Sequence, residues 1–218
     1  MDIRYLGHSS FKISGKQSSV VTDPFSEKDL GFPYPEVSAS VVTVSHDHTD
    51  HNQYKRVRGV KKVFSAPGMY EVESVSFLGL PSFHDDAGGQ KRGKNTIFVI
   101  EMDGVRIAHL GDLGHDLSQG DIDKLGEVDV VFVPVGGVYT IGPRQAAEIT
   151  RRIDPKITIP MHYKTKGINE EIFGALSEVD EFVREIGLEK KMEKKLTIKQ
   201  GSLLPEENQL VIFDGRQA

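Results

Sequence analysis

The stretch His46-Asp47-His48-Thr49-Asp50-His51 says more about fold and function than any other part of this sequence. It places three of the eight histidines and two aspartates within six residues. Neutral imidazole and carboxylate are the ligands that borderline divalent metals prefer. The pattern His-x-His-x-Asp-His should arise by chance in roughly one chain of this composition in a thousand. We therefore interpret it as a metal-binding run and not as a polar turn with capping residues.

The residues before this run, Ser40–Ser45, are apolar and β-branched, which is typical of a buried strand. Four potential ligands therefore leave the end of a strand in a tight loop. On such a loop His46 and His48 can share one ion, and Asp50 and His51 can reach a second. Two-metal sites with a separation of about 3.5–4 Å are a standard device for hydrolysis.

Three other predicted strands also end in a potential ligand, namely His84, Asp112 and His162. Gly111 and Gly114 allow the backbone to turn sharply around Asp112. Each of these residues alone would be interpreted as an ordinary loop or turn residue. Four strand ends that all deliver His or Asp are far more specific, because ligand sites commonly form at strand ends.

Hairpin-like strands dominate the first half of the chain, and strands alternate with helices in the second half. This mixture predicts an α/β protein with two packed sheets and helices outside. The predicted strands are 3–7, 9–13, 18–22, 40–45, 62–65, 69–72, 74–80, 96–101, 105–110, 128–133, 157–160 and an edge strand 210–213. The predicted helices are 118–125, 143–152 and 177–186. The charged run 189–195 is interpreted as a solvated face.

The composition narrows the classes of protein. With 218 residues, the chain suits a single domain spanning 1–218. It has no cysteine, which excludes disulfides and thiolate metal sites. Neither a signal peptide nor a membrane span is expected, and a cytoplasmic location is the default. The net charge of −5 argues against a nucleic-acid partner, and a homo-oligomer is left open.

The order of these motifs resembles the metallo-β-lactamase superfamily. Thr22-Asp23-Pro24, the run 46–51, His84, Gly111-Asp112 and His162 stand in the sequence order of that superfamily's motifs. The opening Tyr5-Leu6-Gly7-His8-Ser9-Ser10-Phe11 resembles the branch of small metal-dependent hydrolases that contains L-ascorbate-6-phosphate lactonase. The resemblance covers nearly the whole chain.

The resemblance implies a four-layer αββα sandwich with two divalent metal ions at one edge of the sheets. It implies that His46, His48 and His84 hold the first ion and that Asp50, His51 and His162 hold the second. Asp112 would bridge both ions. Asp23 would orient the histidine-rich loop from behind, as outer-shell residues do in many metal sites.

The remaining candidates concern the substrate and the other histidines. Lys91 and Arg92 follow His84 in a loop where they could bind a phosphate or carboxylate, and His115 and Lys164 are further candidates for the pocket. His8 is expected to make a structural hydrogen bond, and His109 is expected to be a packed core histidine.

The leading functional hypothesis is a hydrolase that cleaves an ester, lactone or phosphoester of a small molecule with metal-activated water. Asp112 and Asp50 would be catalytic, and Asp50 would orient the nucleophile or assist proton transfer. The ligand set favours zinc, although it also suits manganese or iron. The alternatives are a nuclease or phosphodiesterase of the same superfamily and a non-catalytic metal-binding sensor.

Overall fold

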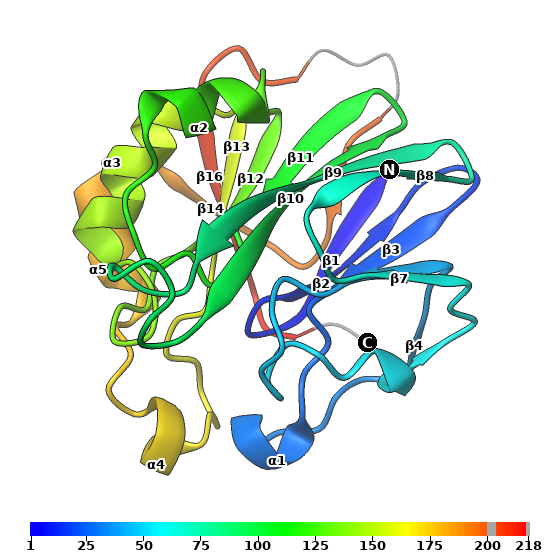
Figure 1. Ribbon diagram of the computed structural model, residues 1–218. Coiled ribbons are helices and arrows are strands. Elements are labelled where there is room, and N and C mark those ends of the chain that lie inside the picture. Colours follow the sequence, from blue (N-terminus) through cyan, green and yellow to red (C-terminus); the bar gives the residue numbers. More distant parts are fainter. Residues whose placement is uncertain (200–203, 217–218) are drawn as a thin grey trace.

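The computed structural model describes residues 1–199 and 204–216, in which two β-sheets pack face to face (Figure 1). The first sheet contains β1 (Asp2–Gly7), β2 (Ser10–Ser14), β3 (Ser19–Thr22), β5 (Val41–Thr43), β7 (Lys62–Phe64) and β15 (Leu196–Thr197). The second contains β8 (Gly68–Val72), β9 (Val75–Phe83), β10 (Lys94–Met102), β11 (Val105–His109), β12 (Val130–Pro134), β13 (Ile157–Met161), β14 (Lys190–Glu193) and β16 (Gln209–Phe213). A short parallel pair joins β4 (Val37–Ser38) to β6 (Val57–Arg58).

The helices are short. They are α1 (Glu27–Leu30), α2 (Gln119–Leu125), α3 (Pro143–Ile153), α4 (Glu170–Phe173), α5 (Val179–Ile186) and a 3₁₀-helix at Tyr54–Arg56. The proline that opens α3 lacks the N–H that a first helical turn leaves unpaired. Gly187 ends α5 in the left-handed conformation, with φ of 72°. The three helices predicted from the sequence are confirmed within two residues at each end.

The main core lies between the two sheets. Phe11 of β2 and Phe132 of β12 are both fully buried, and their rings stack with 4.1 Å between centroids. Apolar residues of the two facing strand surfaces surround this pair, among them Ile13 and Ile159. Alternation along the antiparallel strands sends one face of each sheet into this core.

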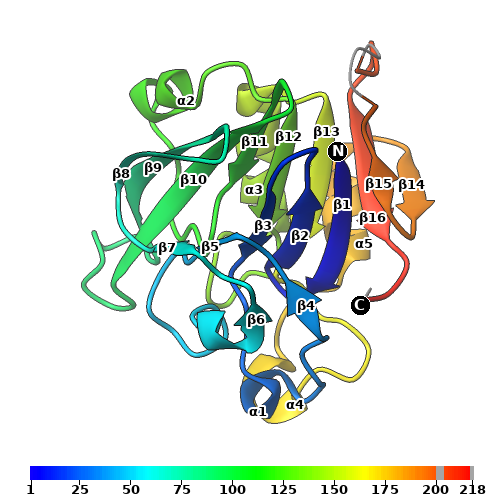
Figure 2. The same ribbon diagram turned by 90° about the vertical axis from the view of Figure 1, so that its right-hand side faces the viewer.

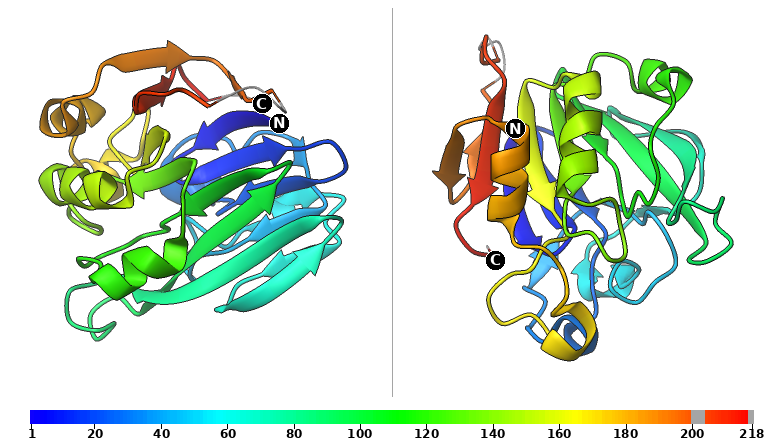
Figure 3. Two further views of the ribbon diagram at one scale, coloured as in Figure 1. Left: turned by 90° about the horizontal axis from the view of Figure 1, so that it is seen from above. Right: turned by 90° about the vertical axis from the view of Figure 1, so that its left-hand side faces the viewer.

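The outer faces of the two sheets are covered differently. On the second sheet, α2, α3 and α5 form a helical layer over β11, β12 and β13 (Figure 3). On the first sheet, Leu6, Val21 and Val42 pack against apolar residues of α1, α4 and the loop before β4. Figure 2 shows α1 and α4 together at the lower end of this sheet. The predicted αββα order is therefore confirmed, although single-turn helices and loops make up most of the layer over the first sheet.

Strand directions bring several strand ends to one edge of the molecule. The second sheet has the order β14-β16-β13-β12-β11-β10-β9-β8, and β11, β12 and β13 run parallel. The first sheet has the order β15-β1-β2-β3-β5-β7, and β3, β5 and β7 run parallel. Parallel strands end at the same edge of a sheet. The residues that follow β3, β5, β11 and β13 can therefore meet.

One prediction about the second sheet is wrong. The strand at Leu210–Phe213 was expected at an edge, but β16 lies between β13 and β14. β14 has the sequence Lys190-Lys191-Met192-Glu193, which does not alternate between apolar and polar residues and so does not predict a strand. The alternation is missing because all four residues are exposed and none faces the core. Charged residues on an outermost strand oppose pairing with other molecules.

No helix among the described residues combines the length and apolarity needed to cross a bilayer.

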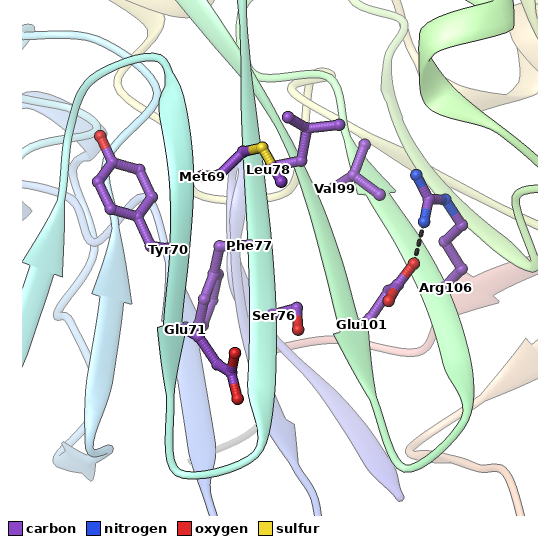
Figure 4. Close-up of a pocket in the computed structure, with 9 residues that line it drawn as sticks. All are labelled: Met69, Tyr70, Glu71, Ser76, Phe77, Leu78, Val99, Glu101 and Arg106. Carbon is purple, nitrogen blue, oxygen red and sulfur yellow. Dashed lines mark hydrogen bonds and ion pairs between the residues drawn. The ribbon is translucent and has the colours of Figure 1, made fainter.

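A hollow of about 480 Å³ lies on the outer face of β8, β9, β10 and β11 (Figure 4). Met69, Leu78 and Val99 line it, and Arg106 forms an ion pair with Glu101 at its rim. No histidine lines the hollow, and its arginine is already paired. It therefore offers no cluster of free ligand atoms.

Candidate metal centre

Asp23, which follows β3, holds both ends of the histidine-rich loop. Its Oδ1 accepts a hydrogen bond from the backbone N–H of Ser45 at 2.8 Å, and its Oδ2 accepts one from the Ser45 hydroxyl at 2.6 Å. The same Oδ2 lies 2.9 Å from Nδ1 of His51. Because the carboxylate accepts from Nδ1–H, the lone pair of His51 is left on Nε2, which faces the cluster.

Asp112 lies at the centre of the cluster. Its Oδ2 is 3.1 Å from Nε2 of His162, 3.2 Å from Nε2 of His84, 3.3 Å from Nε2 of His51 and 3.8 Å from Nε2 of His46. Its backbone N–H donates to the side-chain oxygen of Asn95 at 3.0 Å. The side chain is almost completely buried. One carboxylate therefore stands among four imidazoles.

The ligand atoms fall into overlapping groups, within each of which they lie no more than 4.8 Å apart. One group is His46, His48 and His84; another is His8, Asp50, His51 and His162; a third is His46, His51 and Asp112. The structure thus brings together all seven residues that the family resemblance assigns to two ions, and it adds His8 to the group of Asp50, His51 and His162. Asp112 falls between the sets.

His8 is the residue whose position the sequence reasoning missed. It makes a hydrogen bond, as predicted, but the partner is Asp50, with 3.3 Å between Nε2 and Oδ2. Its ring lies 4.0 Å from that of His162, and its carbonyl accepts from the backbone N–H of His162 at 3.1 Å. A signal was present, because His8 also follows a predicted strand. His109 is buried and its Nε2 lies 2.9 Å from the Ser9 carbonyl, which confirms the prediction of a core histidine.

The charge of the cluster suits a bound cation. Burial opposes a charge on His51, but Asp112 and Asp50 outweigh it and raise the pKa of His51 well above its usual value. Burial likewise opposes ionisation of Asp112, yet His162 and His51 hold its pKa well below the usual range. Burial and the neighbouring His51 lower the pKa of His46 to about 3, so His46 is neutral. The surrounding carboxylates stabilise positive charge, and a divalent cation would supply it.

Buried polar atoms without a hydrogen-bond partner also indicate that the cluster suits a bound cation. Nε2 of His46 and His51, both ring nitrogens of His162 and Oδ1 of Asp112 have no hydrogen-bond partner in the described part of the chain. Buried polar atoms are normally satisfied, and a group of unsatisfied ones needs an explanation. An all-nitrogen and oxygen donor set fits Zn²⁺, Mn²⁺ or Fe²⁺. The residues present therefore fit a metal ion.

Four of the eight non-glycine residues with positive φ in the described part of the chain lie in or near the cluster. Asp23, His8 and His162 all have positive φ, at 39°, 55° and 52°, as does Val138 at 58° in a nearby loop. Positive φ is uncommon outside glycine, and it is a marked outlier for a β-branched residue. Strained residues persist where the surrounding contacts fix them, and they gather at functional sites.

Comparisons with known proteins agree with this geometry. Residues 2–162 match the model of a β-lactamase superfamily domain. A solved structure from Thermotoga maritima, described as a Zn-dependent hydrolase of the metallo-β-lactamase superfamily, is 36% identical, covers 98% of each chain and superposes with a TM-score of 0.77. The chain belongs to the metallo-β-lactamase superfamily.

Relatives within this superfamily carry the name UPF0173 metal-dependent hydrolase. One from Methanoculleus marisnigri is 31% identical over 76% of this chain and 82% of its own. Another from Thermococcus onnurineus is 28% identical over 75% of this chain and 84% of its own. They place the chain among metal-dependent hydrolases. Their names give no substrate, so the resemblance to lactonases stays a prediction.

In this member of the metallo-β-lactamase superfamily, the cluster of candidate ligands opens into a cavity of about 430 Å³. Its metal-facing side is formed by His48, Asp50, His84, Asp112 and His162. The rest of its lining is Asp29, Thr49, Arg92, Tyr139, Ile172 and Phe173. Sequence reasoning missed Asp29, Ile172 and Phe173, because α1 and α4, which carry them, gave no sequence signal.

Three of the four predicted substrate contacts are elsewhere. Lys91 pairs with Asp86 at 2.7 Å, and Lys164 donates to the Gly174 carbonyl at 3.0 Å. His115 accepts a hydrogen bond from the backbone N–H of Phe83 at 3.2 Å and lines a separate cavity of about 30 Å³. These residues have partners of their own and do not line the cavity of about 430 Å³ beside the cluster. Arg92 does line it.

Two glycines let chain segments approach the histidines closely. A Cβ on Gly136 would lie far inside van der Waals contact of the carbonyl oxygen of His162. A Cβ on Gly114 would overlap the backbone of His84 and Asp85 in the same way. Glycine is required at these positions because the contacted atoms belong to backbone that cannot move aside.

Asp85 organises the loop that follows His84. Its Oδ1 accepts backbone N–H groups of Ala87 and Gly89 at 2.8 and 2.9 Å, and its Oδ2 accepts those of Lys91 and Arg92 at 2.9 and 2.7 Å. Burial opposes its ionisation, but these four donors hold the pKa of Asp85 below its usual range. One carboxylate therefore fixes the backbone that presents Arg92.

Replacing Asp85 by Asn is expected to loosen this loop. The amide offers one acceptor oxygen and turns its NH₂ group toward two N–H donors. Hydrogen exchange at the four bonded amides should become about tenfold faster or more. Asp86→Asn removes the same charge but only an exposed bond to Lys91, so it should leave exchange unchanged. Equal exchange in wild type and Asp85→Asn would contradict this role.

Proposed function

We propose that this metal-dependent hydrolase holds two divalent cations and uses them to hydrolyse an ester, lactone or phosphoester of a small molecule. The observation that carries the proposal is the position of Asp112, whose Oδ2 lies 3.1 to 3.8 Å from four imidazole nitrogens. His46, His48 and His84 would hold one cation, and Asp50, His51 and His162 would hold the other. Asp112 would bridge the pair, and Asp23 would keep the loop in place.

Zinc is the proposed metal. Five of the seven ligands are imidazoles, and this nitrogen-rich set suits Zn²⁺, whereas Mg²⁺ and Ca²⁺ prefer oxygen ligands. Manganese and iron remain the competitors for an all-nitrogen and oxygen site. When bound, such cations would supply Lewis acidity and lower the pKa of water, so that hydroxide is available near neutral pH.

Asp50 is the proposed catalytic carboxylate. It lines the cavity, and its side chain is 16% exposed, so it can reach a substrate. Its Oδ2 lies between Nε2 of His51 at 3.4 Å and Nε2 of His8 at 3.3 Å. These contacts fix the carboxylate in one direction, from which it would orient the attacking water and accept its proton.

The size of the cavity supports a small-molecule substrate. About 430 Å³ lies within the usual size range for small-molecule sites. Tyr139, Ile172 and Phe173 give it an apolar side opposite the candidate ligands. Such a cavity would accept a scissile carbonyl or phosphoryl group at the cations and a less polar part against these side chains.

The test combines metal analysis with activity. Purified protein should contain zinc and hydrolyse some of a panel of lactones, phosphodiesters and thioesters. His48→Ala should lower metal content and reduce activity on the order of a hundredfold or more, since outer-shell changes alone cost 10–100-fold. His48 is exposed, so its loss should leave the fold intact.

His115→Ala is the matched control, because this histidine lies outside the cluster. It should retain full metal and activity. Wild-type activity in His48→Ala protein that has been shown to be metal-free would refute the proposal. Fully metal-loaded wild type that is inert toward the whole panel would instead favour a metal-binding sensor.

A further inference from the structure

We propose that Arg92 binds an anionic group of the substrate, so that the natural substrate carries a carboxylate or phosphate besides the bond that is cleaved. The inference rests on the proposed function and adds the substrate class to it. Among the four side chains predicted to contact substrate, only Arg92 lines the cavity beside the metal cluster.

The Arg92 side chain is held in place by a hydrogen bond and a ring contact, and neither contact neutralises its charge. One guanidinium nitrogen, Nη2, donates to the carbonyl of Val138 at 3.1 Å. The guanidinium carbon lies 5.1 Å from the centroid of the Tyr139 ring, a distance at which a cation is attracted to the ring face. In the described part of the chain, no carboxylate lies within ion-pair distance of Arg92. Because a guanidinium has five N–H donors, most of them remain for a ligand.

The loop opposite Arg92, which contains Val138 and Tyr139, is also held by hydrogen bonds. The backbone N–H of Tyr139 donates to the carbonyl of Gly137 at 2.6 Å, which closes a three-residue turn around Val138. Such a turn with a positive φ at its centre is rare and strained. The Tyr139 hydroxyl donates to the carbonyl of Ile172 at 2.7 Å. The Val138 carbonyl is thereby held where it orients Arg92, and α4 is tied to the same loop.

Other arginines show what an occupied guanidinium looks like in this protein. Arg106, at the hollow of about 480 Å³, pairs with Glu101 (Figure 4). It also donates to the Leu125 carbonyl. Arg152 pairs with Asp116 at 2.8 Å. Arg92 is half-buried and has no such counter-ion, and it lies in the same cavity as the proposed cations. That combination suits an anion, and a planar fork matches carboxylate and phosphate geometry.

The experiment compares two esters with the same leaving group. They are 4-nitrophenyl acetate, which is neutral, and mono-4-nitrophenyl succinate, which carries a free carboxylate. The ratio of kcat/KM for the anionic ester to that for the neutral ester should fall about 10- to 100-fold in Arg92→Gln, the scale of a lost charge-assisted hydrogen bond. Arg92→Lys keeps the charge but not the fork, so its ratio should be intermediate.

Arg144→Gln is the matched control. Arg144 is an exposed arginine on α3 that pairs with Glu148, and its loss should leave the ratio unchanged. Inhibition of acetate-ester hydrolysis by benzoate and by phenylphosphonate separates the two anions, since the better match should lose more affinity in Arg92→Gln. Metal content should be the same in all variants.

Each outcome decides the inference. A ratio that is unchanged in Arg92→Gln, at equal metal content, would overturn it. If metal-loaded wild type hydrolyses neither ester, the proposed function is challenged, and calorimetric binding of phenylphosphonate then tests Arg92 by itself. Weaker binding to Arg92→Gln than to wild type would still support an anion site, and equal binding would rule it out.

Discussion

Asp112→Asn is expected to abolish hydrolysis and to remove most of the bound metal. The amide is the same size as the carboxylate but carries no charge, so it cannot bridge two cations. Activity should fall by about a thousandfold or more, the scale on which enzymes lose a principal charge-stabilising group. Metal content measured by mass spectrometry should fall well below that of wild type.

The metal-free variant should nevertheless fold. The amide NH₂ can donate to a neighbouring imidazole nitrogen, and loss of the charge removes one reason for His51 to hold a proton. Asp116→Asn, on the same loop but exposed, should keep both metal and activity. Circular dichroism identical to wild type with metal and activity lost together is the expected pattern. Full activity in Asp112→Asn would exclude Asp112 as a bridging ligand.

Gly136→Ala is expected to give the second large effect, this time through the backbone. The new methyl group would collide with the carbonyl of His162, which cannot rotate away. The free energy of unfolding should fall by about 3 kcal/mol, at the upper end of the usual range for overpacking. Since the collision displaces a candidate ligand, metal affinity should fall with stability, as measured by denaturant unfolding and metal titration.

Gly142→Ala provides the control for this change. Gly142 lies in the same loop and precedes α3, but a Cβ there would meet nothing within 4 Å. Its effect should be no more than about 1 kcal/mol, the scale of a helix-capping change. If Gly136→Ala were as stable as Gly142→Ala, the close approach to His162 would not require glycine at position 136.

Much of the fold follows from local sequence patterns. Apolar β-branched segments such as 40–45 and 128–133 predict buried strands, and both form strands within the two sheets. The pattern fails at β14 because all four of its residues are exposed and three of them are charged. The pairing of β14 with β16 decides its structure, and no local signal encodes that contact.

The candidate ligands could be predicted because strand ends have a fixed place in a sheet. His84, Asp112 and His162 each follow a strand, so their convergence follows from topology. His8 also follows a strand, but its hydrogen bond to Asp50 spans 42 residues and depends on how the first sheet meets the histidine-rich loop. Long-range contacts of that kind cannot be read from spacing.

The substrate contacts were the least predictable. The sequence places Lys91 and Arg92 side by side in one loop, with nothing to distinguish them. In the structure, Asp86 neutralises Lys91 and the Val138 carbonyl holds Arg92 toward the cavity. Which of two adjacent basic residues keeps free donors depends on partners elsewhere, and the loops that supply those partners carry no periodic signal.

The candidate ligands are supplied by both halves of the sandwich. His8 and the run 46–51 extend from the first sheet, whereas His84, Asp112 and His162 extend from the second. Cations bound by ligands from both sheets would cross-link the two sheets. This cross-link would be lost when either sheet unfolded. Resistance to heat would then track the free metal concentration, because each tenfold rise above the dissociation constant adds about 1.4 kcal/mol per bound cation to the stability of the folded state.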